Sequence, residues 1–273
     1  MRTLYLSDLD GTLLRSDQTI SAFTARTINE LVKQGMFFSY ATARSYITAS
    51  RVTAGMNAHI PLVLYNGAFI LDSTTQKVLF SNIFQQSQAQ ELLDCLRSRE
   101  IWPIVYSMQG GKERFSYLLG QMTDGVRTFV QSRKGDVRDH PVQREEQLRE
   151  GDIFYFTCID EEQKLRPIYE HYREQLHCVF QKDLYTGDQW LEIMPMFASK
   201  SHAAQQLKEL LCCERLVVFG DGRNDLDLFE IADECYATQN ADPSLKEIAT
   251  GIIGSNDADS VALWLQEHAE FEK

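Results

Sequence analysis

The strongest constraint on the fold comes from two short apolar runs, each of which leads into an acidic turn that contains glycine. The first run covers residues 3–7 and ends at Asp8, and the second covers residues 215–219 and leads to Asp221. Short apolar runs bounded by turn residues are typical of strands buried on both faces of a parallel sheet. Ligands bind beyond the carboxyl ends of such strands, so a functional site is expected where these turns meet.

Helical and strand-like patterns alternate around both runs. A helix is expected over residues 21–34, with Ser21 as its N-cap and Gly35 at its end. Further strands are expected at 36–41, 62–65 and 235–238, and further helices at 44–54, 200–211, 223–232, 242–249 and 257–268. This alternation predicts an α/β fold, with a Rossmann-like core built on a parallel sheet.

The middle of the chain has a different pattern. Strand candidates lie at 102–107, 114–119, 153–159 and 177–181, and helical candidates at 87–98, 121–131 and 161–175. The highly charged stretch 132–151 is expected to be a loop or a surface helix. We therefore predict an inserted α+β domain over residues 84–189, and an α/β core formed by residues 1–83 and 190–273.

Composition narrows the range of partners. The 273 residues carry a formal net charge of −12, which argues against nucleic acid and anionic membranes as partners. None of the six cysteines forms a Cys-x-x-Cys pair, so reduced thiols in a cytoplasmic protein are expected. No apolar stretch approaches the roughly 20 residues that span a membrane. The expected state is a monomer or a weak homodimer.

The acidic turns predict a metal site. If the two strands are neighbours, four carboxylates converge on one crevice: Asp8, Asp10, Asp221 and Asp225. Two unit charges 4 Å apart repel by about 4 kcal/mol at an effective dielectric constant of 20. Such a group needs a cation or raised pKa values, and a site with oxygen ligands alone favours Mg²⁺.

Two further residues stand where an anion could bind. Thr42 follows the strand expected at 36–41, and Lys200 stands at the start of a predicted helix. Transfer of a phosphoryl group requires cations or hydrogen-bond donors at the phosphate oxygens. Taken singly, Thr42 is more often a helix cap and Lys200 a solvated lysine, so their assignment depends on the whole set.

The set resembles the motifs of phosphatases of the haloacid dehalogenase superfamily. The matching pieces are DxDGT at residues 8–12, then Thr42, Lys200 and GDxxND at 220–225. Asn66-Gly67-Ala68 and the closing stretch from Asn256 to Ala262 are similar to the Cof-type branch, which carries a class IIB cap. The chain departs from the family pattern at Ala43, Ser201 and Gln239, and the last change removes a glycine from the loop near residue 239.

The resemblance implies hydrolysis of a small phosphate ester, such as a sugar phosphate, by a Mg²⁺-dependent phosphatase. Asp8 would be the nucleophile and Asp10 the general acid and base, while Thr42 and Lys200 would hold the phosphoryl group. The implied metal ligands are Asp8, the backbone carbonyl of Asp10, Asp221 and Asp225. Asp225 would act by holding either Lys200 or a metal-bound water.

Four more residues are candidates for binding substrate. By the resemblance Asn224 would contact the phosphate. Arg44 would either bind substrate or pair with a carboxylate, and Asn66 would either touch the ligand or shape a turn with Gly67. Two alternatives to the phosphatase are a phosphomutase of the same superfamily and a binding or regulatory protein without enzymatic activity. By the resemblance the inserted α+β domain, residues 84–189, would be the cap domain that selects the substrate, and residues 1–83 and 190–273 would be the catalytic core. The cap carries no motif that identifies the alcohol part of the substrate.

Overall fold

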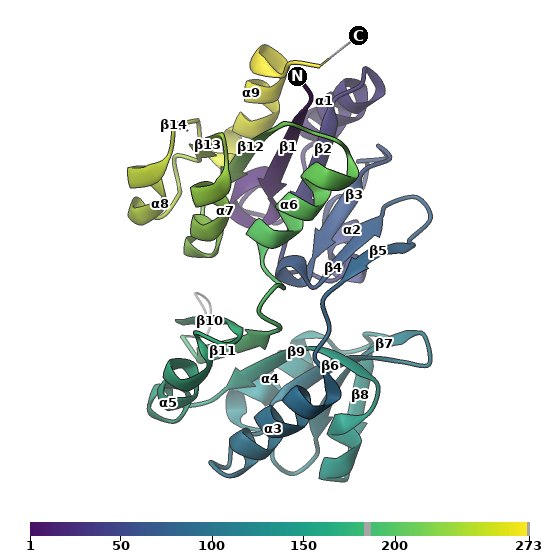
Figure 1. Ribbon diagram of the computed structural model, residues 1–273, viewed down its shortest axis with the longest axis vertical. Coiled ribbons are helices and arrows are strands. Elements are labelled where there is room, and N and C mark those ends of the chain that lie inside the picture. The colour runs from purple at the N-terminus through teal and green to yellow at the C-terminus, as the bar shows by residue number, and fades with distance from the viewer. Residues whose placement is uncertain (183–186, 272–273) are drawn as a thin grey trace. The chain divides into compact units, whose positions relative to one another are not determined.

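The computed structural model describes residues 1–182 and 187–271. Its contacts divide the chain into two compact units. The first, here called the core unit, comprises Met1–Ser81 and Ala198–Lys273, and the second, the inserted unit, comprises Asn82–Phe197 (Figure 1). The core unit is therefore assembled from two segments that are far apart in the sequence.

The core unit is built on a mixed sheet with the strand order β14-β13-β12-β1-β2-β3-β4-β5. Neighbours from β14 to β3 run parallel, and β4 and β5 continue the sheet antiparallel. The prediction of an α/β fold with a parallel sheet is confirmed. The strands are β1 (Thr3–Asp8), β2 (Phe37–Ala41), β3 (Pro61–Leu64), β4 (Phe69–Asp72), β5 (Val78–Ser81), β12 (Arg215–Gly220), β13 (Glu234–Ala237) and β14 (Gly251–Ile252).

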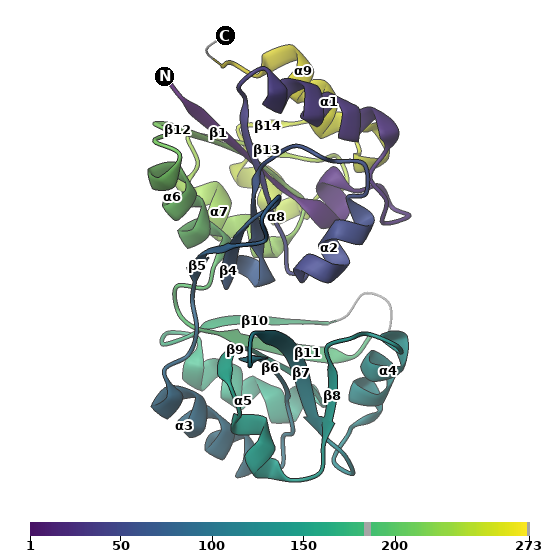
Figure 2. The same ribbon diagram turned by 90° about the vertical axis from the view of Figure 1, so that its right-hand side faces the viewer.

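Helices cover both faces of this sheet (Figures 1 and 2). They are α1 (Ala22–Lys33), α2 (Tyr46–Val52), α6 (Lys200–Leu210), α7 (Leu226–Ile231), α8 (Pro243–Ile248) and α9 (Ser260–His268). On one face Leu4 and Leu6 of β1 share a buried cluster with Leu207 of α6. On the other face Tyr5 lies against Trp264 of α9. Every residue of β1 is buried, as expected for a strand covered on both sides.

Local sequence signals explain where α1 begins and ends. The Ser21 hydroxyl accepts a hydrogen bond from the Thr24 N–H at 2.9 Å, which confirms Ser21 as the N-cap. Gly35 follows the last turn with a φ of 109°, a conformation that glycine adopts without strain. The helix therefore has the bounds that its capping residues predict, to within a residue at each end.

The inserted unit has a separate sheet with the order β10-β11-β9-β6-β7-β8. Leu92 and Leu96 of α3 and Leu165 of α5 share a buried cluster with Phe156 and Leu191 of the sheet. The strands are β6 (Ile104–Gln109), β7 (Lys112–Leu118), β8 (Asp139–Val142), β9 (Asp152–Ile159), β10 (His177–Lys182) and β11 (Gln189–Met194), and the helices are α3 (Gln86–Arg97), α4 (Asp124–Ser132) and α5 (Glu162–Tyr172).

Two details of the expected organisation differ from the structure. The stretch 132–151 is not simply a loop or a surface helix, because β8 within it pairs with β7 and a short helical turn follows at Glu145–Arg149. The expected domain boundaries were 83/84 and 189/190, whereas the two units divide at 81/82 and 197/198. The second shift arises because β11 pairs with both β9 and β10.

Among the helices of the described residues, none combines the length and apolar character needed to cross a bilayer.

Candidate active site

The pairing of three strands brings the two acidic turns together. β1 lies between β12 and β2, with Ser7 opposite Phe219 and Asp8 opposite Ala41. Because all three strands run parallel, their carboxyl ends share one edge of the sheet. Asp8, Asp221 and Thr42 each stand at or just beyond the end of a different strand at this edge. The convergence expected from the two apolar runs follows from this register.

A buried lysine links two of the carboxylates. The Lys200 ammonium group donates hydrogen bonds to Asp8 Oδ1 at 2.5 Å and to Asp225 Oδ1 at 2.6 Å. The Lys200 side chain is 1% exposed and the Asp225 side chain is fully buried. Lys200 is the first residue of α6, whose N-cap Ser199 accepts a hydrogen bond from the His202 N–H. The cap fixes the start of the helix and hence the direction of the lysine.

Asp221 completes a group of three carboxylates. One oxygen atom from each of Asp8, Asp221 and Asp225 lies within 4.8 Å of the other two. The Thr12 hydroxyl donates to Asp221 Oδ1 at 2.8 Å. Asp225 Oδ2 accepts the N–H groups of Asp221 and Gly222, both at 3.2 Å. Asp225 therefore shapes the acidic turn with one oxygen and holds Lys200 with the other.

The pKa values of this group reflect burial and crowding. Burial raises the pKa of Asp8 well above its usual range, and the neighbouring carboxylates raise it further against the opposing charge of Lys200. Burial and Asp225 raise the pKa of Asp221 to about 6. Burial acts to lower the pKa of Lys200, but Asp225 and Asp8 outweigh it, and the net shift is upward. The lysine is thus a permanent cation among acids that favour an additional positive charge.

The donor set of this cluster fits Mg²⁺. Three carboxylates face one ammonium group, so the cluster carries excess negative charge that a cation would neutralise. Its ligands are oxygen atoms, which Mg²⁺ prefers. The turn around Gly11 is compatible with such a site, because a Cβ atom at Gly11 would lie 2.2 Å from Asp221 Oδ2. Only glycine allows Asp221 to approach the first acidic turn so closely.

Asp10 lies apart from the three clustered carboxylates. Its side chain is 48% exposed and accepts hydrogen bonds from Arg44 Nε at 2.8 Å and from a second guanidinium nitrogen at 2.5 Å. Of the four carboxylates expected to converge, the group found among the described residues contains Asp8, Asp221 and Asp225 without Asp10. The charge of Asp10 still acts to raise the pKa of Asp221, so Asp10 lies near this group but outside it. Of the two roles left open for Arg44, the structure has the ion pair with a carboxylate.

The loops after β2 and β3 position the other candidates. Thr42 is buried, its hydroxyl accepts the Arg44 N–H at 3.1 Å, and its carbonyl accepts the Asn66 N–H at 2.9 Å. A Cβ atom at Gly67 would lie 2.2 Å from the Ser199 carbonyl oxygen. The turn at Gly67 therefore packs directly against the residue that precedes Lys200. Asn224 is exposed in the turn that leads to Asp225.

Two polar residues of the site were not assigned a role from the sequence. Thr12 holds Asp221, although it belongs to the DxDGT motif. Asn240 donates from its amide nitrogen to the Gly11 carbonyl at 2.7 Å and accepts the Asn256 N–H at 3.2 Å. Asn240 follows β13, whose carboxyl end lies at the same sheet edge as that of β12. The position of Asn240 just after a predicted strand could have indicated from the sequence that Asn240 and the loop near Gln239 belong to the site.

A family model described as haloacid dehalogenase-like hydrolase matches residues 5–265. The chain belongs to the haloacid dehalogenase-like hydrolases. The resemblance drawn from the motifs is thereby confirmed, as is the expectation of a hydrolase.

Two relatives match this hydrolase over nearly their full length. Two proteins of Bacillus subtilis (strain 168), YwtE and YitU, are both named 5-amino-6-(5-phospho-D-ribitylamino)uracil phosphatase. YwtE is 26% identical over 95% of this chain and 96% of its own, and YitU is 25% identical over 96% and 95%.

Solved structures of similar proteins share the fold. TM0651 from Thermotoga maritima aligns with a TM-score of 0.78 at 21% identity and covers 99% of both chains. BT1666 from Bacteroides thetaiotaomicron, described as a phosphatase of the haloalkanoate enzyme superfamily, aligns with a TM-score of 0.80 at 15% identity and covers 98% of this chain and 95% of its own. At these identities the likeness establishes the fold of this hydrolase and nothing finer.

Proposed function

We propose that this hydrolase is a Mg²⁺-dependent phosphatase that transfers the phosphoryl group of a small phosphate monoester to Asp8. The observation that carries the proposal is the buried contact of Asp8 with Lys200 beside the carboxylates of Asp221 and Asp225. A structural ion pair would be balanced, whereas this cluster carries more negative charge than one lysine neutralises. The names of the Bacillus subtilis relatives, both phosphatases, support the same reading.

In the first step one Asp8 carboxylate oxygen attacks phosphorus. A bond forms between Asp8 and phosphorus, and the bond from phosphorus to the alcohol oxygen breaks. The departing oxygen takes a proton from the carboxyl group of Asp10, which leaves Asp10 as a carboxylate. Because Arg44 holds the Asp10 carboxylate in the structure, Asp10 has to leave that ion pair before it donates the proton.

In the second step water attacks the phosphorus of the aspartyl phosphate. Asp10 now accepts a proton from the water, the bond between phosphorus and Asp8 breaks, and inorganic phosphate leaves. Asp8 is restored as a carboxylate and Asp10 as a carboxylic acid, so the cycle is balanced. The same side chain thus serves as acid in one step and as base in the next.

Other residues of the site stabilise the transferred phosphoryl group. Lys200 supplies a fixed positive charge at Asp8, and Thr42 and Asn224 supply hydrogen-bond donors. Mg²⁺, held by Asp8, Asp221 and the backbone carbonyl of Asp10, with Asp225 beside them, would neutralise part of the repulsion between the anionic nucleophile and the anionic phosphate. Burial of the lysine strengthens its effect, because little water screens the charge.

A phosphate-release screen tests this proposal. The purified protein is incubated with Mg²⁺ and a panel of sugar phosphates, nucleotides, flavin and pyridoxal phosphates, together with 5-amino-6-(5-phospho-D-ribitylamino)uracil because of the two relatives' names. We expect release of inorganic phosphate from at least one compound, loss of release with excess EDTA, and recovery with added Mg²⁺. Full activity in EDTA would contradict the metal requirement.

The same screen separates the rival functions. A phosphomutase would release phosphate only poorly and would need a sugar bisphosphate, whereas a binding protein would release none from any compound. The acid role of Asp10 is tested with Asp10→Asn on two substrates. We expect a smaller loss for nitrophenyl phosphate, whose leaving group needs little protonation, than for an alkyl phosphate. Equal losses would argue against Asp10 as the acid.

A further inference from the structure

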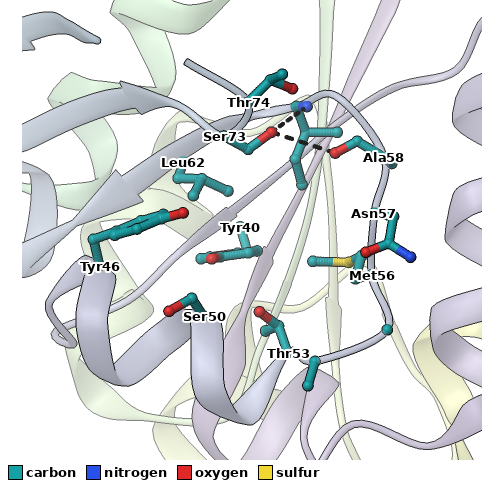
Figure 3. A pocket seen from close by; sticks show the side chains of 13 residues that line it. Tyr40, Tyr46, Ser50, Thr53, Met56, Asn57, Ala58, Leu62, Ser73 and Thr74 are labelled. Carbon is teal, nitrogen blue, oxygen red and sulfur yellow. Dashed lines mark hydrogen bonds between the residues drawn. The ribbon is translucent and has the colours of Figure 1, made fainter. Parts of the chain in front are cut away.

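A pocket lies in the core unit between α2, the end of β2, β3 and the loop that joins α2 to β3 (Figure 3). Its volume is about 340 Å³, at the small end of the range for ligand sites. None of the clustered carboxylates contributes to its wall. The lining residues are Tyr40, Tyr46, Ser50, Thr53, Ala54, Gly55, Met56, Asn57, Ala58, Ile60, Leu62, Ser73 and Thr74.

The wall of this pocket carries no charged side chain. Its polar groups are hydroxyls, one amide and backbone atoms, as the lining residues make plain. An anion such as a phosphate ester would find no cation there, and an ammonium ion would find no carboxylate. Because transfer of an unpaired charge out of water is costly, the pocket disfavours ions of either sign. This wall differs from the carboxylate cluster that would take the phosphate ester.

Three of the six side-chain hydroxyls that line the pocket give their protons to backbone carbonyl groups. Thr53 donates its proton to the Ala49 carbonyl at 2.9 Å, Ser50 donates to Ile47 at 3.3 Å, and Ser73 donates to Ala58 at 3.3 Å. The Ser73 oxygen already accepts a hydrogen bond from the Ile60 N–H at 3.0 Å, whereas no such donor is found for Ser50 and Thr53 among the described residues. A hydroxyl whose proton is used in this way still has acceptor capacity. The pocket therefore favours a ligand that is rich in hydrogen-bond donors.

Apolar side chains line the pocket together with these hydroxyl groups. Leu62, Ile60 and Met56 line the same pocket. Figure 3 shows Ser50 and Tyr46 pointing toward a common space from α2. Molecules that expose hydroxyl groups along their edges and C–H groups on their faces match such a surface. Sugars and cyclic polyols have this character, and both are uncharged.

We propose that this pocket binds a small uncharged molecule rich in hydroxyl groups, of monosaccharide or cyclitol size. The site is distinct from the phosphate-transfer site and does not depend on its chemistry. Tyr40 stands two residues before Thr42, and Tyr46 follows Ser45 at the start of α2. An occupant would thus touch residues on both sides of the loop that carries Thr42, without replacing any group of the carboxylate cluster.

Binding without turnover tests the proposal. Ligand-observed NMR and calorimetry would be run on the full-length protein with glucose and myo-inositol, and with gluconate and glucosamine as anionic and cationic counterparts of similar size. We expect saturable binding of at least one neutral compound and none of the two charged ones at the same concentrations. Absence of binding for both neutral compounds would overturn the proposal, and so would equal binding of gluconate.

Two variants locate the site. Ser50→Phe places a ring in the pocket, and Arg51→Phe places the same ring on the neighbouring exposed position of α2. We expect Ser50→Phe to weaken binding by about tenfold or more, which corresponds to about 1.4 kcal/mol, and Arg51→Phe to leave it unchanged. Equal binding by all three proteins would overturn the location.

A conservative variant keeps the test decisive if Ser50→Phe fails to fold. Thr53→Val preserves the size of the side chain and removes the lone pairs that Thr53 offers. We expect Thr53→Val to bind the neutral compound more weakly and to keep its phosphatase activity, since Thr53 does not belong to the phosphate-transfer site. Unchanged binding in Thr53→Val would contradict the role assigned to the wall hydroxyls.

Discussion

Each unit of the molecule buries a cation between carboxylates, but the two arrangements differ in balance. In the core unit Lys200 faces Asp8 and Asp225, with Asp221 beside them. In the inserted unit Arg138 is 5% exposed and pairs with Asp136 and Glu113, both at 2.7 Å.

The hydrogen bonds explain the difference. The Arg138 guanidinium donates to both oxygens of Asp136 and also to Glu113, and it lies 5.7 Å from the centre of the Phe115 ring. That geometry matches a planar, bidentate pair that holds a loop against a strand. Lys200 has a single charged atom for two carboxylates and, among the residues that the structure describes, makes no ion pair with the third, Asp221. The Arg138 cation thus contacts both of its carboxylates, whereas the Lys200 cluster holds a third carboxylate that a further cation could bind, which is the property expected of a site.

The largest effect is expected from a substitution that disrupts the core cluster. Asp8→Asn removes the nucleophile, so we expect phosphate release to fall by about a thousandfold or more. The midpoint of thermal unfolding should stay the same or rise, because the change removes one buried acid from a group of three. Asp17→Asn, at an exposed position, is the control and should keep full activity. More than a few per cent of wild-type turnover in Asp8→Asn would remove Asp8 from its role.

The next largest effect is expected on stability, from a substitution that disrupts the cluster in the inserted unit. Arg138→Met leaves two carboxylates without their cation, and we expect a loss of stability of about 3 kcal/mol, seen as a lower unfolding temperature. Activity per folded molecule should not change. Arg127→Met, which removes an exposed pair with Asp124, should cost only about 0.5 kcal/mol or less. If both variants unfolded at the wild-type temperature, the Arg138 cluster would have no structural role.

Addition of metal sharpens the comparison further. Mg²⁺ at about one hundred times its dissociation constant should stabilise the protein by about 2.7 kcal/mol if it binds the folded state alone. We expect the rise in unfolding temperature in the wild type and its loss in Asp221→Asn, measured by scanning calorimetry without substrate. The same rise in both proteins would place the ion elsewhere.

The smallest expected effect concerns a lone acid of the inserted unit. Burial raises the pKa of Glu192 to about 7, while Tyr155 and Arg133 act to lower it. The folded state therefore holds a proton that the unfolded chain releases at lower pH, so this residue makes stability fall as pH rises from about 4.5 to 7.

Glu192→Gln should remove this pH dependence. We expect a gain of about 2 kcal/mol or less at pH 8 and no gain at pH 4, measured as unfolding temperature against pH. Glu174→Gln, on an exposed side chain, is the matched control and should show no such trend. A gain of equal size at both pH values would mean that packing, not ionisation, is responsible.

Much of the core could be predicted because its information lies in short local patterns. An apolar run followed by an acidic turn specifies both a strand and the edge at which it ends, so the meeting of Asp8 with Asp221 follows once β1 and β12 pair. The order of Thr42 and Lys200 along the chain then identified the cluster.

The rest depended on contacts that local patterns do not encode. The pairing of Asp10 with Arg44 depends on side-chain directions within a turn, and Asn240 reaches Gly11 across 229 residues of sequence. In the inserted unit β8 has only four residues and lies within a highly charged segment, so no strand pattern stands out there in the sequence. The sequence prediction ended that unit at residue 189, before most of β11. Only the pairing of β11 with β9 and β10 shows that this strand belongs to the inserted unit.

The interruption of the core unit has a consequence for synthesis on the ribosome. Asp8 and its partner Lys200 are separated by 192 residues, and β12 is made later still. At about 5–20 residues per second, roughly 10–40 s pass between them. During that time the nascent chain carries a nucleophile without its cation and a central strand without one neighbour, so no truncated product that ends within the inserted unit can carry the assembled site.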